Sequence, residues 1–128
     1  MSEAVTTNTA RGKIAQAHYE GKTIPQIIEA GWGEGGVDEN GSVITPSPTL
    51  TVVPEEFTRT PVVERSVDLS DVYVSFTLVL DGSQGHDGRE LSSCGLYDEE
   101  GDLVAVINFS IKDIEEDTLI ELIWKEEF

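Results

Sequence analysis

Apolar and polar positions alternate through the second half of the chain. Every second residue over Val72–Leu80 is apolar, which is the period of a strand with one face in a core. Two further strands are expected at Glu90–Tyr97 and Leu103–Phe109, joined by a turn at Asp98–Asp102 whose glycine supplies a positive φ. A last strand is expected at Leu119–Lys125, where apolar residues again share one face.

The first segment has a helical rather than a strand pattern. A helix is expected over Thr7–Glu20, with Thr7 or Thr9 as its N-cap and Gly21 ending it. Its apolar stripe is narrow and is formed by Ala10, Ile14 and Ala17, with His18 beside them.

The region between the helix and the regular strands is less ordered in its pattern. A short strand around Ile27 and Ile28 is expected to start after Pro25, because proline cannot donate to a ladder. Residues 31–48 contain stacked turn signals and are expected to form a flexible loop. The chain is then expected to be extended over Leu50–Val53.

These elements amount to one helix followed by about six strands, mostly joined by short turns. They predict an α+β fold, with the N-terminal helix packed on a mostly antiparallel β-sheet or small β-sandwich. A chain of 128 residues suits a single domain over residues 1–128.

The charge balance excludes several classes of partner. The chain has 25 Asp+Glu against 8 Lys+Arg, a net charge of −17. Direct binding to nucleic acid or to an anionic membrane needs a cationic surface, so neither is expected. No apolar run is long enough for membrane insertion, and the first residues lack the apolar core of a signal peptide, so a cytosolic origin is expected. The acidity fits either a solvated surface or adaptation to high salt.

Carboxylates in the turns raise the question of calcium. Asp98, Glu100 and Asp102 have the spacing of the first ligands of a calcium loop, but the required glycine and the later bidentate glutamate are missing. The set Asp38, Asn40 and Ser42 fails in the same way. We therefore predict turns at both places, with no metal and no cofactor.

No catalytic residues are predicted. Cys94 is the only cysteine, and its shared face with apolar residues favours a buried thiol over a nucleophile paired with His86. The glycine-rich run at residues 31–36 lacks the Lys-Ser/Thr of a phosphate loop. Large aromatic residues remain as candidate partner-binding anchors, namely Trp32, Trp124 and Phe128.

One stretch carries a more specific signal. The segment Ser92–Phe109, SSCGLYDEEGDLVAVINF, resembles the signature of the N-terminal attachment domain of phage tail-collar fibre proteins. In that family a strand of the form EIGLFD leads through an acidic glycine turn into LxAVxNF. The helix at Thr7–Glu20 and the glycine-rich run after Ile27 occupy similar places in both.

The resemblance implies a non-enzymatic virion structural protein of a phage-like tail. Its expected partners are other tail, baseplate or fibre subunits, with homo-oligomers, commonly trimers, assembled in the host cytoplasm. Because the sequence ends at Phe128 without a fibre shaft or receptor-binding tip, we expect an adaptor or baseplate component, with another subunit making host contact. Copies of charge −17 repel at low salt, so assembly is expected to strengthen with salt.

Two other functions remain alternatives. An acidic protein can mimic the phosphate backbone and inhibit a DNA-binding protein, although these acids lie largely in turns. A small glycan hydrolase would need a pair of carboxylates, which 25 acidic residues supply by chance.

Overall fold

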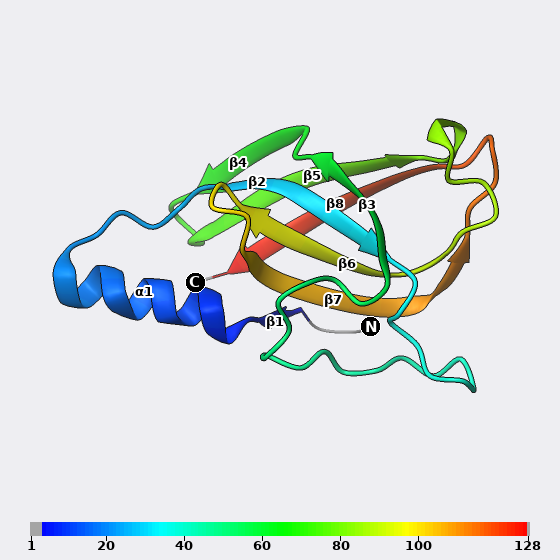
Figure 1. Ribbon diagram of the computed structural model, residues 1–128. Coiled ribbons are helices and arrows are strands. Elements are labelled where there is room, and N and C mark those ends of the chain that lie inside the picture. The colour runs from blue at the N-terminus through cyan, green and yellow to red at the C-terminus, as the bar shows by residue number, and fades with distance from the viewer. Residues whose placement is uncertain (1–3, 128) are drawn as a thin grey trace.

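The computed structural model describes residues 4–127, which form two antiparallel β-sheets facing one another and one helix (Figure 1). The elements in chain order are β1 (Val5–Thr6), α1 (Asn8–Glu20), β2 (Ile27–Gly33), β3 (Glu56–Pro61), β4 (Glu64–Asp68), β5 (Tyr73–Asp81), the 3₁₀ turn η1 (Gly82–Gln84), β6 (Glu90–Asp98), β7 (Leu103–Asp113) and β8 (Leu119–Glu127).

The two sheets differ in size. The larger has the order β1-β7-β6-β2-β3, and the smaller has the order β4-β5-β8. The chain passes from the first to the second sheet between β3 and β4, where the Val62 N–H donates to Ile28 and the Val63 N–H donates to Thr77. The expected mostly antiparallel, sandwich-like architecture is confirmed.

The predicted strands of the second half are present with their inner faces as expected. Phe76, Leu78 and Leu80 of β5 are buried, and β6 and β7 form a hairpin through a turn in which Gly101 has φ 84°. All eight residues of 91–98 are buried, because β6 lies between β7 and β2 in the large sheet and has an apolar cluster on each face. The described residues contain eight strands instead of about six, since β1 and β4 are too short for a pattern to reveal.

The helix has the predicted ends, but its predicted packing on the sheet is not confirmed. Thr7 caps α1 by accepting the Ala10 N–H at 3.2 Å, and Gly21 ends it with φ 72°. Ala10 is the only buried residue of α1, and the helix extends beyond the end of the sheets (Figure 1). Its apolar stripe is made mainly of alanines, which offer little area to bury.

The structure differs from two of the predictions made for residues 31–61. Gly31, Trp32 and Gly33 belong to β2, so the expected loop begins only after them. No strand forms at Leu50–Val53, and the strand lies instead at β3. The glycines serve close packing here, because a Cβ at Gly33 would overlap the carbonyl of Pro54, which lies against it.

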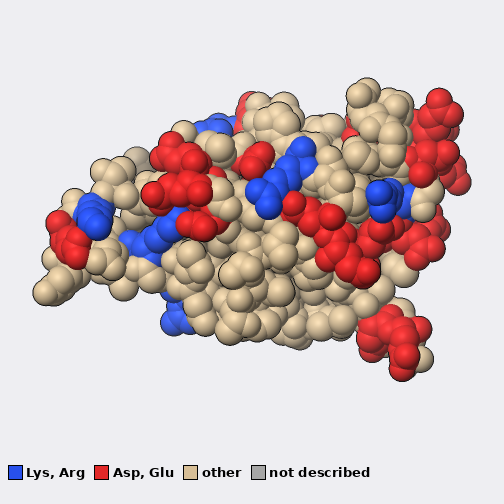
Figure 2. All heavy atoms as spheres, viewed as in Figure 1, with Lys and Arg blue, Asp and Glu red and all other residues tan. Residues whose placement is uncertain are grey.

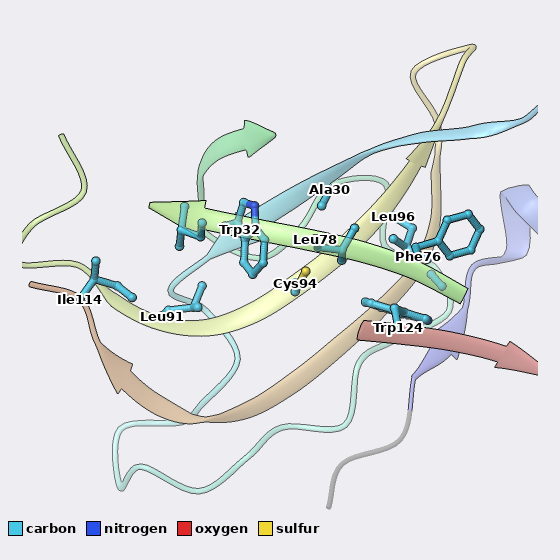
Figure 3. Close-up of a cluster of buried hydrophobic side chains, with 11 residues drawn as sticks. Ala30, Trp32, Phe76, Leu78, Leu91, Cys94, Leu96, Ile114 and Trp124 are labelled. Atoms are coloured by element: carbon cyan, nitrogen blue, oxygen red, sulfur yellow. The ribbon is translucent and has the colours of Figure 1, made fainter. Parts of the chain in front are cut away.

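The main core lies between the two sheets (Figure 3). It combines the inner faces of β5 and β8 with those of β2, β6 and β7. Its buried residues are Ala30, Trp32, Phe76, Leu78, Leu80, Leu91, Cys94, Leu96, Ala105, Ile114 and Trp124. A second, smaller cluster on the other face of the large sheet consists of Val53, Tyr97, Leu103 and Val106.

Candidate functional site

The turn between β6 and β7 holds α1 at one end of the sandwich. Asp98 is buried, and its carboxylate accepts the N–H groups of Glu100 and Asp102 at 2.9 and 3.0 Å. The Nζ of Lys13, from α1, lies 2.7 Å from a carboxylate oxygen of Asp98. The carboxylates of Glu100 and Asp102 approach the same Nζ to 2.9 and 2.7 Å. One ammonium group therefore joins the helix to three acids of the turn.

The charge of Lys13 is favoured by this arrangement. Burial alone would lower the pKa of Lys13, but the hydrogen bonds to Asp102, Asp98 and Glu100 outweigh it and raise the pKa above its ordinary value. The same three carboxylates are close enough together to hold a metal ion, but the Lys13 ammonium group already lies among them. Residues 98–102 thus form a turn, as predicted.

The start of α1 is fixed to the sheet as well. Thr7 is buried, and its hydroxyl donates to the carbonyl of Leu103 at 2.6 Å. The Thr7 N–H donates to the carbonyl of Val104 at 2.9 Å. With Lys13 as a second attachment point, the first half of α1 is held by β7 and its turn.

A groove of about 460 Å³ lies between α1 and the near ends of the sheets. Its walls are mainly apolar, with Arg11 and Lys13 on the helix side and Glu126 and Glu127 from β8 also lining it. Such a groove can receive an apolar segment of another polypeptide. Its apolar lining comes from Ala10, Ile14, Ile24, Pro25, Ile27, Val74, Phe76 and Val104.

Tyr97 holds the segment after Val53 against the large sheet. The Val53 N–H donates to the Tyr97 hydroxyl at 3.0 Å, and that hydroxyl donates to Glu56. The Arg59 guanidinium lies 3.6 Å from the centre of the Tyr97 ring and donates to Glu56 at 2.6 Å. Burial raises the pKa of Tyr97, and the bond to Glu56 raises it further. The cluster is a structural contact.

Two of the three predicted aromatic anchors, Trp32 and Trp124, are buried. Trp32 is fully buried, and its indole N–H donates to Thr60 at 2.8 Å. Trp124 is 5% exposed and donates to Glu126 at 2.6 Å. Both indoles pack in the core (Figure 3), so neither is assigned to a docking surface of this chain. Phe128 lies outside the described residues.

Cys94 and His86 do not form a catalytic pair. Cys94 is fully buried in the core, and burial raises the pKa of its thiol. The His86 ring instead lies 5.5 Å from the ring of Phe57. The thiol is a core group, as the pattern of β6 predicted.

The segment after β2 has local order. Val37 and Val43 form a bridge, and the Asp38 carboxylate accepts the N–H groups of Asn40 and Ser42, each at 2.9 Å. These bonds show that Asp38, Asn40 and Ser42 belong to a turn, as predicted. Asn108 of β7 donates to the carbonyl of Ile44 at 2.8 Å, which holds the segment on the large sheet. The flexibility expected for the rest of residues 31–48 stays a prediction.

Acidic side chains gather at both ends of the sandwich (Figure 2). One group covers the β6–β7 turn near α1. The other covers the opposite end, where Asp87, Glu115, Glu116 and Asp117 line a shallow hollow. Between these ends, acidic and basic side chains cross the middle of this view, and the area below them is largely uncharged.

Sequence reasoning missed the groove and the Lys13 contact. Lys13 and Asp98 are 85 residues apart, and nothing in either local pattern links them. The sequence indicated the acidic turn at Asp98–Asp102, but it did not indicate that Lys13 would pair with it.

Comparison with known proteins identifies a family. A family model described as "Phage tail-collar fibre protein, N-terminal" matches residues 1–113. No curated protein and no solved structure matches the chain. Among residues 4–127, no helix is long and apolar enough to cross a membrane.

Proposed function

This chain belongs to the phage tail-collar fibre protein N-terminal family, and on that premise we propose that it attaches a tail fibre to the baseplate or forms part of that junction. The match covers 113 of the 128 residues and is the observation that carries the proposal. The family is structural, so the chain is a structural component of a virion tail. Its role is to bind other subunits, without catalysis.

The groove beside α1 is the surface we assign to another tail subunit. It combines an apolar lining with Arg11 of the helix, the Lys13–Asp98 ion pair and two acids from β8. A partner segment with apolar residues and charges of both signs would match it. The attachments of Thr7 and Lys13 hold the groove open before binding, which reduces the entropy lost on docking.

The chain also associates with copies of itself, as homo-oligomers that include the trimer expected from the family. The net charge of −17 supports protein partners over nucleic acid. Assembly takes place in the host cytoplasm before the tail is complete.

The experiment follows a tagged chain into virus particles. Gold-labelled antibody against the tag is expected to mark the tail region of purified particles in electron micrographs. Ile14→Glu, which places a charge in the groove, is expected to reduce incorporation at least tenfold. Tyr19→Glu is the matched control, because Tyr19 is on the same helix, is 87% exposed and does not line the groove.

Particles without the tag, or label on the capsid, would contradict the tail assignment. Equal incorporation of the two variants would instead remove the groove from the proposal while leaving the tail role intact. Circular dichroism of both variants checks that each remains folded.

A further inference from the structure

Strand β8 is a long, regular edge of the small sheet. It pairs with β5 over all nine of its residues, from Leu119 to Glu127, without a register shift. Within the described residues, no strand pairs with its other side. It has no proline and no bulge, and the protection of its edge is limited to charged side chains, namely Glu121, Lys125, Glu126 and Glu127. Its backbone can therefore accept another strand.

The space beside β8 is also incompletely filled. The large sheet has five strands and the small sheet has three, so the small sheet does not fully cover the inner face of β7. An apolar hollow of about 180 Å³ lies between β7 and β8, with Ile107, Phe109, Ile120 and Leu122 half-buried in its lining. A fourth strand added beside β8 would extend the small sheet over this hollow.

We propose that this strand is β8 of a second copy, paired antiparallel about a twofold axis at Ile123. In the register that pairs all nine residues, Ile123 lies opposite the partner's Ile123. Glu121 then lies opposite the partner's Lys125, and the symmetry makes this pair twice. On the inner face Leu122 lies opposite the partner's Trp124.

The charges and exposures of β8 favour this pairing. Opposite charges face one another across the axis, which supports cross-strand association. Ile123 is 64% exposed and Leu119 is 66% exposed, so the outer face offers apolar area to a partner. Lys125 is half exposed, and its present partners are Glu127 and the Tyr73 ring, both at the surface.

The other edge of the same sheet does not offer this match. Strand β4 has only five residues. Pairing all five with a second copy would place Glu64 opposite the partner's Asp68, and like charges facing one another are destabilising. The structure thus distinguishes two edges of one sheet, and only β8 is self-complementary.

Disulfide trapping tests the axis directly. Residues directly opposite in antiparallel strands have Cα atoms about 4.5–5.5 Å apart, within the range of a disulfide. The native Cys94 is fully buried, so the new thiol of Ile123→Cys is the accessible one among the described residues. We expect mild oxidation in about 1 M salt, where repulsion between copies is screened, to convert most of Ile123→Cys to a covalent dimer.

Ser66→Cys is the matched control, because Ser66 is exposed and lies at the centre of β4, where it would face its own copy if that edge paired. It is expected to stay monomeric on non-reducing gels. Cross-linking of Ser66→Cys alone, equal cross-linking of both variants, or none in either would overturn the proposal.

Charge exchange provides a second test that does not need a new thiol. Lys125→Glu and Glu121→Lys are each expected to weaken dimerisation at least fivefold in sedimentation velocity. The double variant with both changes restores opposite charges and is expected to recover the wild-type dissociation constant. Lys22→Glu is the control for Lys125→Glu, since both change the net charge from −17 to −19. Glu39→Lys is the control for Glu121→Lys, since both change it from −17 to −15.

Failure of the double variant to recover, with both single variants folded, would overturn the pairing. This inference rests on the self-association included in the proposed function, and the twofold β8 contact is an interface separate from those of the trimer. The tail assignment and the β8 pairing can be refuted separately. Antibody labelling of the tail does not depend on β8, and dimerisation through β8 in solution does not depend on the tail.

Discussion

At the scale of single residues, close packing explains the glycine-rich run better than flexibility does. Gly36 donates its N–H to the Ser92 hydroxyl at 2.8 Å and lies against the backbone of β6. Its φ is not positive, so space alone requires a glycine there. Gly12, in α1, has no such constraint, because a Cβ added to it would meet no other atom within 4 Å.

Replacing these two glycines by alanine is expected to have opposite effects. Gly36→Ala would overlap the Ser92 carbonyl and lower the free energy of unfolding by about 1–3 kcal/mol. Gly12→Ala would raise it by up to about 1 kcal/mol, because alanine loses less backbone entropy in a helix. Urea unfolding at constant salt measures both. An unchanged midpoint for Gly36→Ala would show that the segment moves freely off the sheet.

At the scale of elements, α1 depends on side chains far from it in sequence. The helix buries only Ala10, so its position relies on the polar contacts of Thr7 and Lys13 rather than on an apolar face. Lys13 is also the partner of Asp98, whose side chain is 3% exposed. Losing the ammonium group would leave that carboxylate buried without its counter-charge.

Lys13→Met is therefore expected to lower the free energy of unfolding by about 2 kcal/mol at neutral pH. The folded state raises the pKa of Lys13 above its ordinary 10.5, so this contribution is complete below that pH. It is lost as the pH rises through the folded-state pKa. The stability difference between wild type and variant should thus be constant from about pH 7 to 10 and shrink above it.

Lys22→Met is the control for this prediction, since it removes the same charge from an exposed site where Lys22 pairs with the exposed Glu20. Its effect is expected to stay within about 0.5 kcal/mol. If both variants lost equal stability, net charge rather than the Lys13 contact would be responsible.

At the scale of the whole molecule, the net charge opposes both folding and assembly. Each chain carries −17, and acids gather at both ends of the sandwich and also lie across the face between them (Figure 2). Screening by salt shortens the range of this repulsion to about 10 Å at 0.1 M and about 3 Å at 1 M. Contacts made mainly by apolar groups and backbone are weakened much less by salt than the repulsion is.

Self-association is accordingly expected to strengthen with salt. Light scattering across a series from about 0.05 to 2 M sodium chloride should show the average mass rising with salt concentration, and millimolar divalent cations should act in the same direction. Tighter association in dilute buffer would contradict this prediction, since it would mean that attraction between opposite charges dominates.

The secondary structure of the second half was largely predictable, because period-two patterns and turn glycines are local signals. The turn at Gly101 and the inner faces of β5 and β8 follow from these signals alone. Strand β3 was not predictable, because its residues pair with a distant β2 and carry little alternation of their own. The burial of Trp32 and Trp124 was not decided by the sequence, since a large aromatic residue suits both a core and an interface.

The sequence by itself determined the strand-rich architecture, the ends of α1, the hairpin of β6 and β7 and the family to which the chain belongs. These depend on neighbours within a few residues or on a contiguous motif. Only the tertiary structure decided that Lys13 lies among the acids of the turn, that a groove opens beside α1 and that β8 is a free edge among the described strands. Such features join residues distant in the chain, and they depend on how two sheets of unequal size close on one another.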